Sequence, residues 1–145
     1  MTKCEGAYNM NDLKERTKRF ALDVTRLCSA MPSTQEFWII NRQLIKCATS
    51  VGANYRSCRR AKSNADFIAK LSIVEEEADD SMYWLELIGE LIPTENKELR
   101  RLHCEANELT SIFVQSKKTA RSRSQAQAGP LRTSNFALRT SNARP

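Results

Sequence analysis

The side chains best placed for chemistry are cations that recur at helical spacing in the middle of the chain. At about 100° per residue, four of them fall within about 80° of one another, and two more add charge at the same end. A row of such cations can contact successive phosphates of RNA or DNA. The alternative is that these cations complement a helix dipole or pair with acidic residues of the next helix. The candidate nucleic-acid-binding residues are Arg42, Lys46, Arg56, Arg59, Arg60 and Lys62.

Residues that could support catalysis or hold a metal are sparse. The chain has one histidine, His103, and the residue three positions before it is Arg100 rather than the acid that a di-iron bundle needs. No Cys-x-x-Cys pair suggests zinc, and no glycine pattern suggests a phosphate-binding loop. The acidic run at 75–80 spreads over several helix faces, as a solvated surface does. We therefore expect no enzyme, no cofactor and no metal site.

The five cysteines are odd in number and widely spaced, which argues against a disulfide framework and favours a reducing cytoplasm. Cys28, Cys47 and Cys58 share the apolar phase of their helices, so we expect them in the core. Cys4 and Cys104 fall outside that phase. A thiol enzyme, as a competing hypothesis, would need one of these two to be reactive.

A second apolar stripe runs along the expected third helix, in addition to its core stripe. Its members fall within about 60° of one another. One buried stripe per helix is enough for a bundle, so the second predicts an interface, most simply with another copy of the chain. The alternative is a single wide core face. The candidate oligomer-interface residues are Ile73, Trp84, Leu87 and Leu91.

Three consecutive residues of the expected second helix, Gly52, Ala53 and Asn54, are typical of close helix packing. Glycine in a helix interior destabilises it by about 1 kcal/mol relative to alanine, so a close approach of another helix would compensate. Asn54 is expected to form a hydrogen bond with a neighbouring helix.

These residues are positioned by four segments of helical period, and no strand pattern competes with them. Ser33 and Glu36 read as a capping box before the second segment, Ser63 as the N-cap of the third, and the stretch 93–95 as the cap of the fourth. Because all connections are short, the sequence predicts an all-α, antiparallel up-down-up-down four-helix bundle over 12–118. The expected helices cover about 12–31, 34–62, 64–92 and 96–118.

The net charge of +6 comes from the end of the chain. All seventeen acidic residues lie at or before Glu108, whereas seven basic residues and no acid follow from Lys117 onward. Residues 119–145 are therefore predicted to be a disordered, basic, low-complexity tail. No apolar run is long enough for a transmembrane helix, so we expect no membrane partner.

Several stretches resemble a known family. They are Gln43-Leu44, the run 49–54 (Thr-Ser-Val-Gly-Ala-Asn), the run 66–71 (Asp-Phe-Ile-Ala-Lys-Leu) and the run 83–87 (Tyr-Trp-Leu-Glu-Leu). Over about 15–115 the chain resembles the bacterial four-helix bundle proteins encoded in 23S rRNA intervening sequences. The resemblance implies a homopentamer without enzymatic activity. Related proteins are accessory subunits of diversity-generating retroelements that bind a reverse transcriptase and nucleic acid through a basic surface.

The sequence thus predicts a non-enzymatic, cytoplasmic bundle that self-associates and binds RNA or another nucleic acid through a basic helix face. The alternative is a protein-interaction adaptor, for example an accessory subunit that docks a reverse transcriptase, with no direct contact to nucleic acid.

Overall fold

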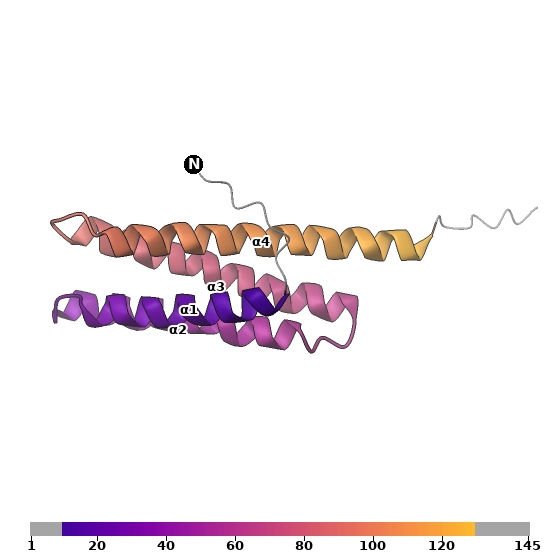
Figure 1. Cartoon of the computed structure of the whole chain (residues 1–145), viewed down its shortest axis with the longest axis horizontal. Helices are drawn as coiled ribbons and strands as arrows, with labels where there is room; N and C mark the ends of the chain where they lie inside the picture. Colours follow the sequence, from indigo (N-terminus) through magenta and orange to yellow (C-terminus); the bar gives the residue numbers. More distant parts are fainter. Residues whose placement is uncertain (1–9, 130–145) are drawn as a thin grey trace, which may run out of the picture.

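The computed structural model describes residues 10–129, which form four α-helices and no strand. Successive helices run in opposite directions, so the chain goes up and down the length of the bundle (Figure 1). The predicted all-α bundle is confirmed. Within the described residues, none of the helices combines the length and apolar content needed to span a lipid bilayer. The helices are α1 (Met10–Ser29), α2 (Gln35–Cys58), α3 (Asn64–Leu91) and α4 (Lys97–Ala128).

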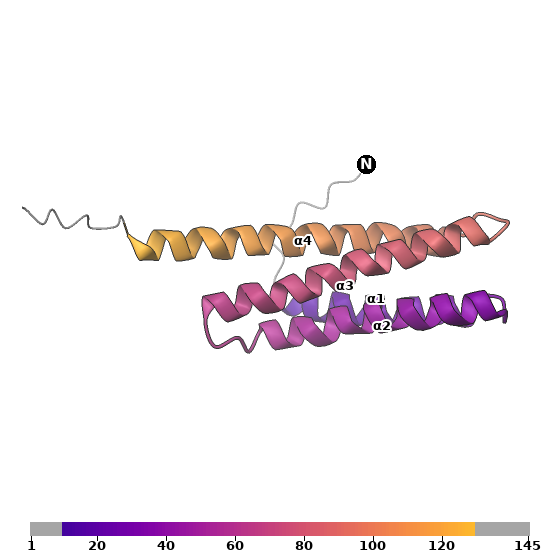
Figure 2. The same ribbon diagram turned by 180° about the vertical axis from the view of Figure 1, so that it is seen from behind.

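Each helix packs mainly against its neighbours in the chain: α2 contacts α1 and α3, and α3 contacts α2 and α4. Figure 2 shows α3 between α2 and α4. α1 and α4 close the bundle with a looser contact that ion pairs reinforce. Arg16 of α1 donates to both carboxylate oxygens of Glu105 at 2.6 and 2.8 Å, and Arg101 of α4 donates to Asp23 at 2.8 Å. Bidentate geometry of this kind orients the two helices as well as attracting them.

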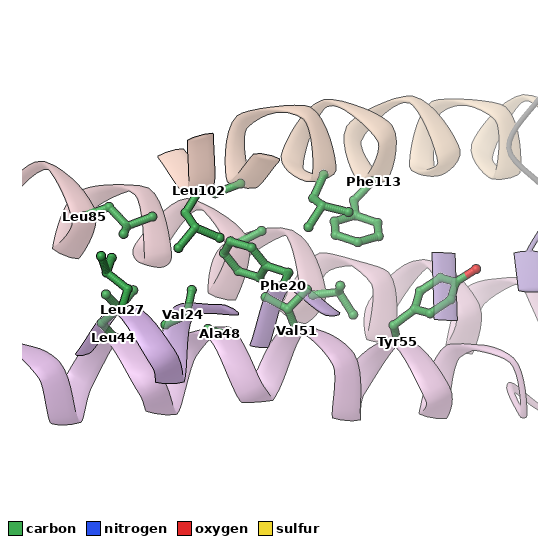
Figure 3. Packing of buried hydrophobic residues seen from close by; sticks show 14 of the residues in the cluster. Phe20, Val24, Leu27, Leu44, Ala48, Val51, Tyr55, Leu85, Leu102 and Phe113 are labelled. Carbon is green, nitrogen blue, oxygen red and sulfur yellow. The ribbon is translucent and has the colours of Figure 1, made fainter. Parts of the chain in front are cut away.

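The core runs along the bundle axis and uses the apolar positions that recur every three or four residues on each helix (Figure 3). Phe20 of α1, Val51 of α2 and Phe113 of α4 are almost fully buried. The ring of Tyr55 lies 6.0 Å from that of Phe113, centroid to centroid. Burial of each such side chain contributes about 1.5–3 kcal/mol relative to leaving it exposed.

Of the three N-caps predicted for α2, α3 and α4, only that of α3 is formed by the predicted residue. The Ser63 hydroxyl accepts the Asp66 N–H at 3.1 Å, so the predicted cap of α3 is confirmed. The capping box at Ser33 is wrong, because Thr34 is the N-cap residue of α2 and its side chain makes no cap bond. The cap of α4 lies just beyond the predicted stretch 93–95: Asn96 Oδ1 accepts the Leu99 N–H at 3.0 Å.

Two predicted boundaries are corrected. α2 ends at Cys58, four residues before the predicted end, and a short turn leads to α3. α4 continues past Lys118 through Ala128, so residues 119–128 are helical rather than part of a disordered tail. Ala120 is buried, and its carbonyl accepts a hydrogen bond of 2.7 Å from the Asn64 amide, which explains why the helix persists. The remaining predicted tail, 130–145, lies outside the described residues.

Candidate functional site

A groove runs between the outer faces of α1 and α2, which lie side by side over their length (Figure 1). Four of the ten residues that line it are cations and none is an acid. We call this surface the α1–α2 groove. Its lining residues are Lys14, Lys18, Ala21, Leu22 and Thr25 of α1, Thr49, Gly52, Ala53 and Arg56 of α2, and Arg60 of the following turn.

Small residues, among them Gly52 and Ala53 of α2 and Ala21 of α1, line the groove between the longer cationic side chains. At Gly52 the two helices come close: a Cβ built there would lie 3.6 Å from the backbone and hydroxyl of Thr17 in α1. α1 and α2 are therefore in contact at Gly52, at a distance that still leaves room for a methyl group. Ala53 is exposed and lines the groove instead of packing against another helix. The Asn54 amide donates to the Ser50 carbonyl of its own helix at 2.9 Å, so the predicted bond to a neighbouring helix is wrong.

The predicted cations separate into two groups. Arg56, Arg59 and Arg60 gather with Lys14 around one hollow at the end of the groove. Lys62 is exposed but does not line the groove. Its backbone N–H donates to Asp66 at 3.0 Å, in the turn that starts α3.

Arg42 and Lys46 are exposed farther along α2, beyond the groove. The Arg42 guanidinium lies 5.5 Å from the centroid of the Trp38 ring, a cation–π distance.

Lys14 and Lys18 are functional candidates that the sequence reasoning missed. Their spacing of four residues, one step off the core stripe of α1, places them on one helix face. That signal could have been found, but only the packing of α1 against α2 brings them beside Arg56 and Arg60. Lys18 also forms a long surface ion pair with Glu15 at 3.8 Å.

For Arg56 and Arg60, the described part of the chain shows no pairing with the acidic third helix, because neither forms an ion pair with an acid of α3. Arg56 does lie in the last turn of α2, where a cation complements the helix dipole. Two acids of α3 have partners on α4: Glu75 pairs with Lys117, and Glu86 lies 2.9 Å from the His103 imidazole. Arg56 and Arg60 therefore stay available for an anionic ligand.

The predicted interface stripe on α3 is only partly exposed. Trp84 and Leu87 are half-buried and pack against the edge of the core, which agrees with the alternative of a wide core face. Ile73 and Leu91 are exposed, at 46% and 50% of their surface. Exposed Tyr83 adds an aromatic ring that meets Trp84 edge-on, 5.0 Å between centroids.

The cysteines of the core are confirmed there, and burial makes them poor nucleophiles. Cys28, Cys47 and Cys58 are buried, and desolvation raises the pKa of each thiol to about 11. At neutral pH these thiols are protonated, whereas the thiolate is the reactive form. Cys104 is exposed, as predicted. Cys4 lies outside the described residues.

One group of potential metal ligands within 10–129 joins two helices. Ligand atoms of Cys47 on α2 and of Glu77 and Asp80 on α3 all lie within 4.8 Å of one another. This group could not be predicted from the sequence, because its residues come together only through packing. Burial and then the two carboxylates raise the pKa of the Cys47 thiol, and a metal would require it to ionise. A structural zinc site would also need a fourth protein ligand.

Comparison with known proteins finds four similar chains among the solved structures. One of them is the crystal structure of a protein with unknown function from the S23 ribosomal protein family from Bacteroides thetaiotaomicron VPI-5482, with 28% sequence identity. The match has a TM-score of 0.67 and covers 73% of this chain and 98% of that chain. A search of curated proteins found no match.

The family model described as 23S rRNA-intervening sequence protein matches residues 10–115, which include α1, α2, α3 and more than half of α4. The last residues of α4 and the predicted tail lie beyond the match. The resemblance seen in the sequence is confirmed over most of the chain. The protein belongs to the 23S rRNA-intervening sequence protein family.

Proposed function

We propose that this protein is a non-enzymatic, self-associating bundle that binds RNA through the α1–α2 groove. The observation that carries the proposal is the composition of the groove: Lys14, Lys18, Arg56 and Arg60 line it, and no acidic residue does. Arg56 and Arg60 form no ion pair with an acid of α3. Among the described residues, Lys18 has only the long surface pair with Glu15, so these cations contact phosphates with little competition. Each phosphate contact also releases counterions, which drives binding at low salt.

The distribution of charge supports a local site over a general attraction. Residues 1–116 hold sixteen basic and seventeen acidic side chains, so the bundle as a whole is nearly neutral. A nearly neutral body with a four-cation groove concentrates positive potential at one place. RNA should therefore bind at the groove instead of spreading over the bundle.

The binding test compares two full-length variants with equal charge changes. Arg56→Gln with Arg60→Gln removes two groove cations, and Lys97→Gln with Arg100→Gln removes two cations at the opposite end of the bundle. Affinity for a fluorescein-labelled 12-nucleotide RNA is measured by anisotropy. The groove variant should lose about tenfold or more, since two phosphate contacts disappear, while the control stays within about twofold. Equal losses in both variants would refute a groove site.

Self-association is supported by apolar side chains that the bundle leaves uncovered on α3. Ile73 and Leu91 are about half exposed, with Tyr83 between them along the helix. A homopentamer is the assembly implied by the family resemblance. Ile73→Glu with Leu91→Glu should shift the mass in analytical ultracentrifugation toward one chain, because charges do not tolerate burial. Wild-type protein that sediments as a 16.5 kDa monomer at micromolar concentration would refute self-association.

The non-enzymatic part of the proposal is supported by the protonated core thiols and by the single histidine, which lies beside Glu86 on the surface. Four free cysteines among the described residues fit a reducing cytoplasm.

An adaptor that docks a nucleic-acid-processing protein is the second candidate, favoured by exposed Tyr83. It predicts that wild-type protein binds no RNA by itself.

A further inference from the structure

The most exposed of the large hydrophobic side chains in the described residues is Trp38, in the first turn of α2, with 63% of its surface accessible. Exposed tryptophan is unusual on a small protein, because its large apolar surface is normally at least partly buried. The Arg42 guanidinium lies over the ring, 5.5 Å from its centroid, and most of the ring stays accessible. Together Trp38 and Arg42 form a small aromatic and cationic surface.

This surface lies in line with the α1–α2 groove. Trp38 and Arg56 are eighteen residues apart on one helix, which is five full turns at 3.6 residues per turn. They therefore point to the same side of α2, about 27 Å apart at 1.5 Å per residue. Thr49, which lines the groove, lies between them on nearly the same line.

No acidic residue lies on α2 between Trp38 and Arg56. The chain contains no Asp or Glu from Phe37 to Ala65, and the facing groove residues of α1 are Lys14, Lys18, Ala21, Leu22 and Thr25. A polyanion lying along α2 would meet the cations of the groove at one end and Arg42 with Trp38 at the other. At about 3.4 Å per stacked nucleotide, 27 Å corresponds to roughly eight nucleotides.

Building on the RNA-binding function proposed above, we propose that Trp38 and Arg42 form a base-stacking platform and that the ligand of the groove is single-stranded RNA. An exposed indole ring stacks on the face of a base, and every base has such a face in a single strand. In a duplex these faces are hidden within the stack, so the platform has no partner there. Arg42 adds a second plane on which a base can stack, as well as a charge for the phosphate.

The platform predicts a preference for unpaired RNA with little dependence on sequence. Stacking accepts all four bases, and the cations read only phosphates. The groove cations alone would bind duplex and single strand through the same charges. Trp38 is therefore a specificity-determining residue.

The test uses the full chain and two probes: a 12-nucleotide RNA of mixed sequence without self-complementarity, and the same RNA annealed to its complement. Trp38→Ala should weaken binding of the single strand by about 5- to 150-fold and leave duplex binding within about twofold. Trp38→Phe should restore part of the loss, because phenylalanine keeps an aromatic face. Ile39→Ala, which shortens the exposed apolar side chain next to Trp38 and keeps the ring, is the matched control and should change neither affinity.

The salt dependence separates stacking from charge. Trp38→Ala should lower the single-strand affinity at every salt concentration without changing the slope of log K against log salt. Removal of one groove cation should make that slope shallower by about 0.7. Thermal melting confirms that each variant is folded.

Three results would overturn the platform: equal losses for single strand and duplex, no loss in Trp38→Ala, or a change in oligomeric state caused by that substitution. The last would show that a second copy of the chain covers Trp38. Failure of the RNA-binding function itself gives a different result from failure of the platform alone. In that case wild-type protein would bind neither the single strand nor the duplex at low salt, and the platform would be refuted as well.

Discussion

Gly52 gives a sharp test of how closely α1 and α2 pack at the floor of the groove. In the interior of a helix, glycine is less favourable than alanine by about 0.5–1 kcal/mol, because the unfolded chain gains more backbone freedom. A Cβ at this position would lie 3.6 Å from the carbonyl carbon, the carbonyl oxygen and the hydroxyl of Thr17. These are ordinary van der Waals contacts, so the methyl group fits without movement of α1.

Gly52→Ala should therefore raise the free energy of unfolding by about 0.5–1 kcal/mol and the melting temperature by roughly 1–4 °C. Urea unfolding followed by circular dichroism measures the change, at one fixed protein concentration because self-association also shifts stability. Gly52→Val is the opposing variant. Its two γ-carbons would push against Thr17, and overpacking of this kind destabilises by about 1–3 kcal/mol.

Gly89 of α3 is the matched control. A Cβ there would lie 3.2 Å from Leu99 Cδ2, at the end of a flexible side chain that must give way slightly. Gly89→Ala should therefore stabilise less than Gly52→Ala. If Gly52→Ala destabilises the protein while Gly89→Ala does not, the two helices are closer at Thr17 than described, and the account of the groove floor is refuted.

Three further predictions concern thiols, pH and the length of α4. With a thiol reagent at pH 7, Cys104 should react quickly and Cys47 only on unfolding, since burial raises the pKa of the Cys47 thiol to about 11; fast reaction of two described cysteines would contradict this. The Lys70 ammonium and then the Lys62 backbone N–H lower the pKa of Asp66 below its usual 3.8, so its contribution to stability is present above that pH and lost as the pH falls through the lowered value. Acid unfolding of Asp66→Asn should show a weaker pH dependence in that range than wild type. Truncation after Lys118 removes buried Ala120 and should lower the melting temperature; an unchanged value would show that the extension does not pack.

The bundle itself was predictable because its core positions recur at helical spacing within each helix. Positions such as Leu44 and Val51 recur at helical spacing and are buried as expected. The Ser63 cap was equally local, since a hydroxyl three residues before a free N–H is sufficient to form it. Features that depend on one helix and its first turn could therefore be read directly.

Features that depend on two helices could not be read in this way. Lys14 and Lys18 became part of the groove only because α1 packs antiparallel to α2. Pairing of the α2 cations with the acids of α3 was an open alternative, and only packing shows that Glu75 and Glu86 have partners on α4. The periodicity of a helix gives the direction of each side chain about the helix axis. It does not say which other helix packs on that side.

The extension of α4 was missed for a different reason. After Lys118 the apolar stripe fades, and fading periodicity resembles the start of a disordered segment. A single small residue, Ala120, still packs, and Asn64 holds its carbonyl from the start of α3. Trp38 was overlooked because the basic stripe was defined by its cations alone, although the ring shares the helix face of Arg56.

The measurement that tests the central claim most directly is the salt dependence of RNA binding in a variant that removes the cations on the α1 side of the groove. Lys14→Gln with Lys18→Gln leaves every cation of α2 in place, so it tests whether the site is truly a groove between two helices. We predict weaker binding of the 12-nucleotide RNA and a slope of log K against log salt that is shallower than wild type by about 1.4, from two lost phosphate contacts. An affinity and a slope equal to those of wild type would contradict the α1–α2 groove as the RNA-binding site.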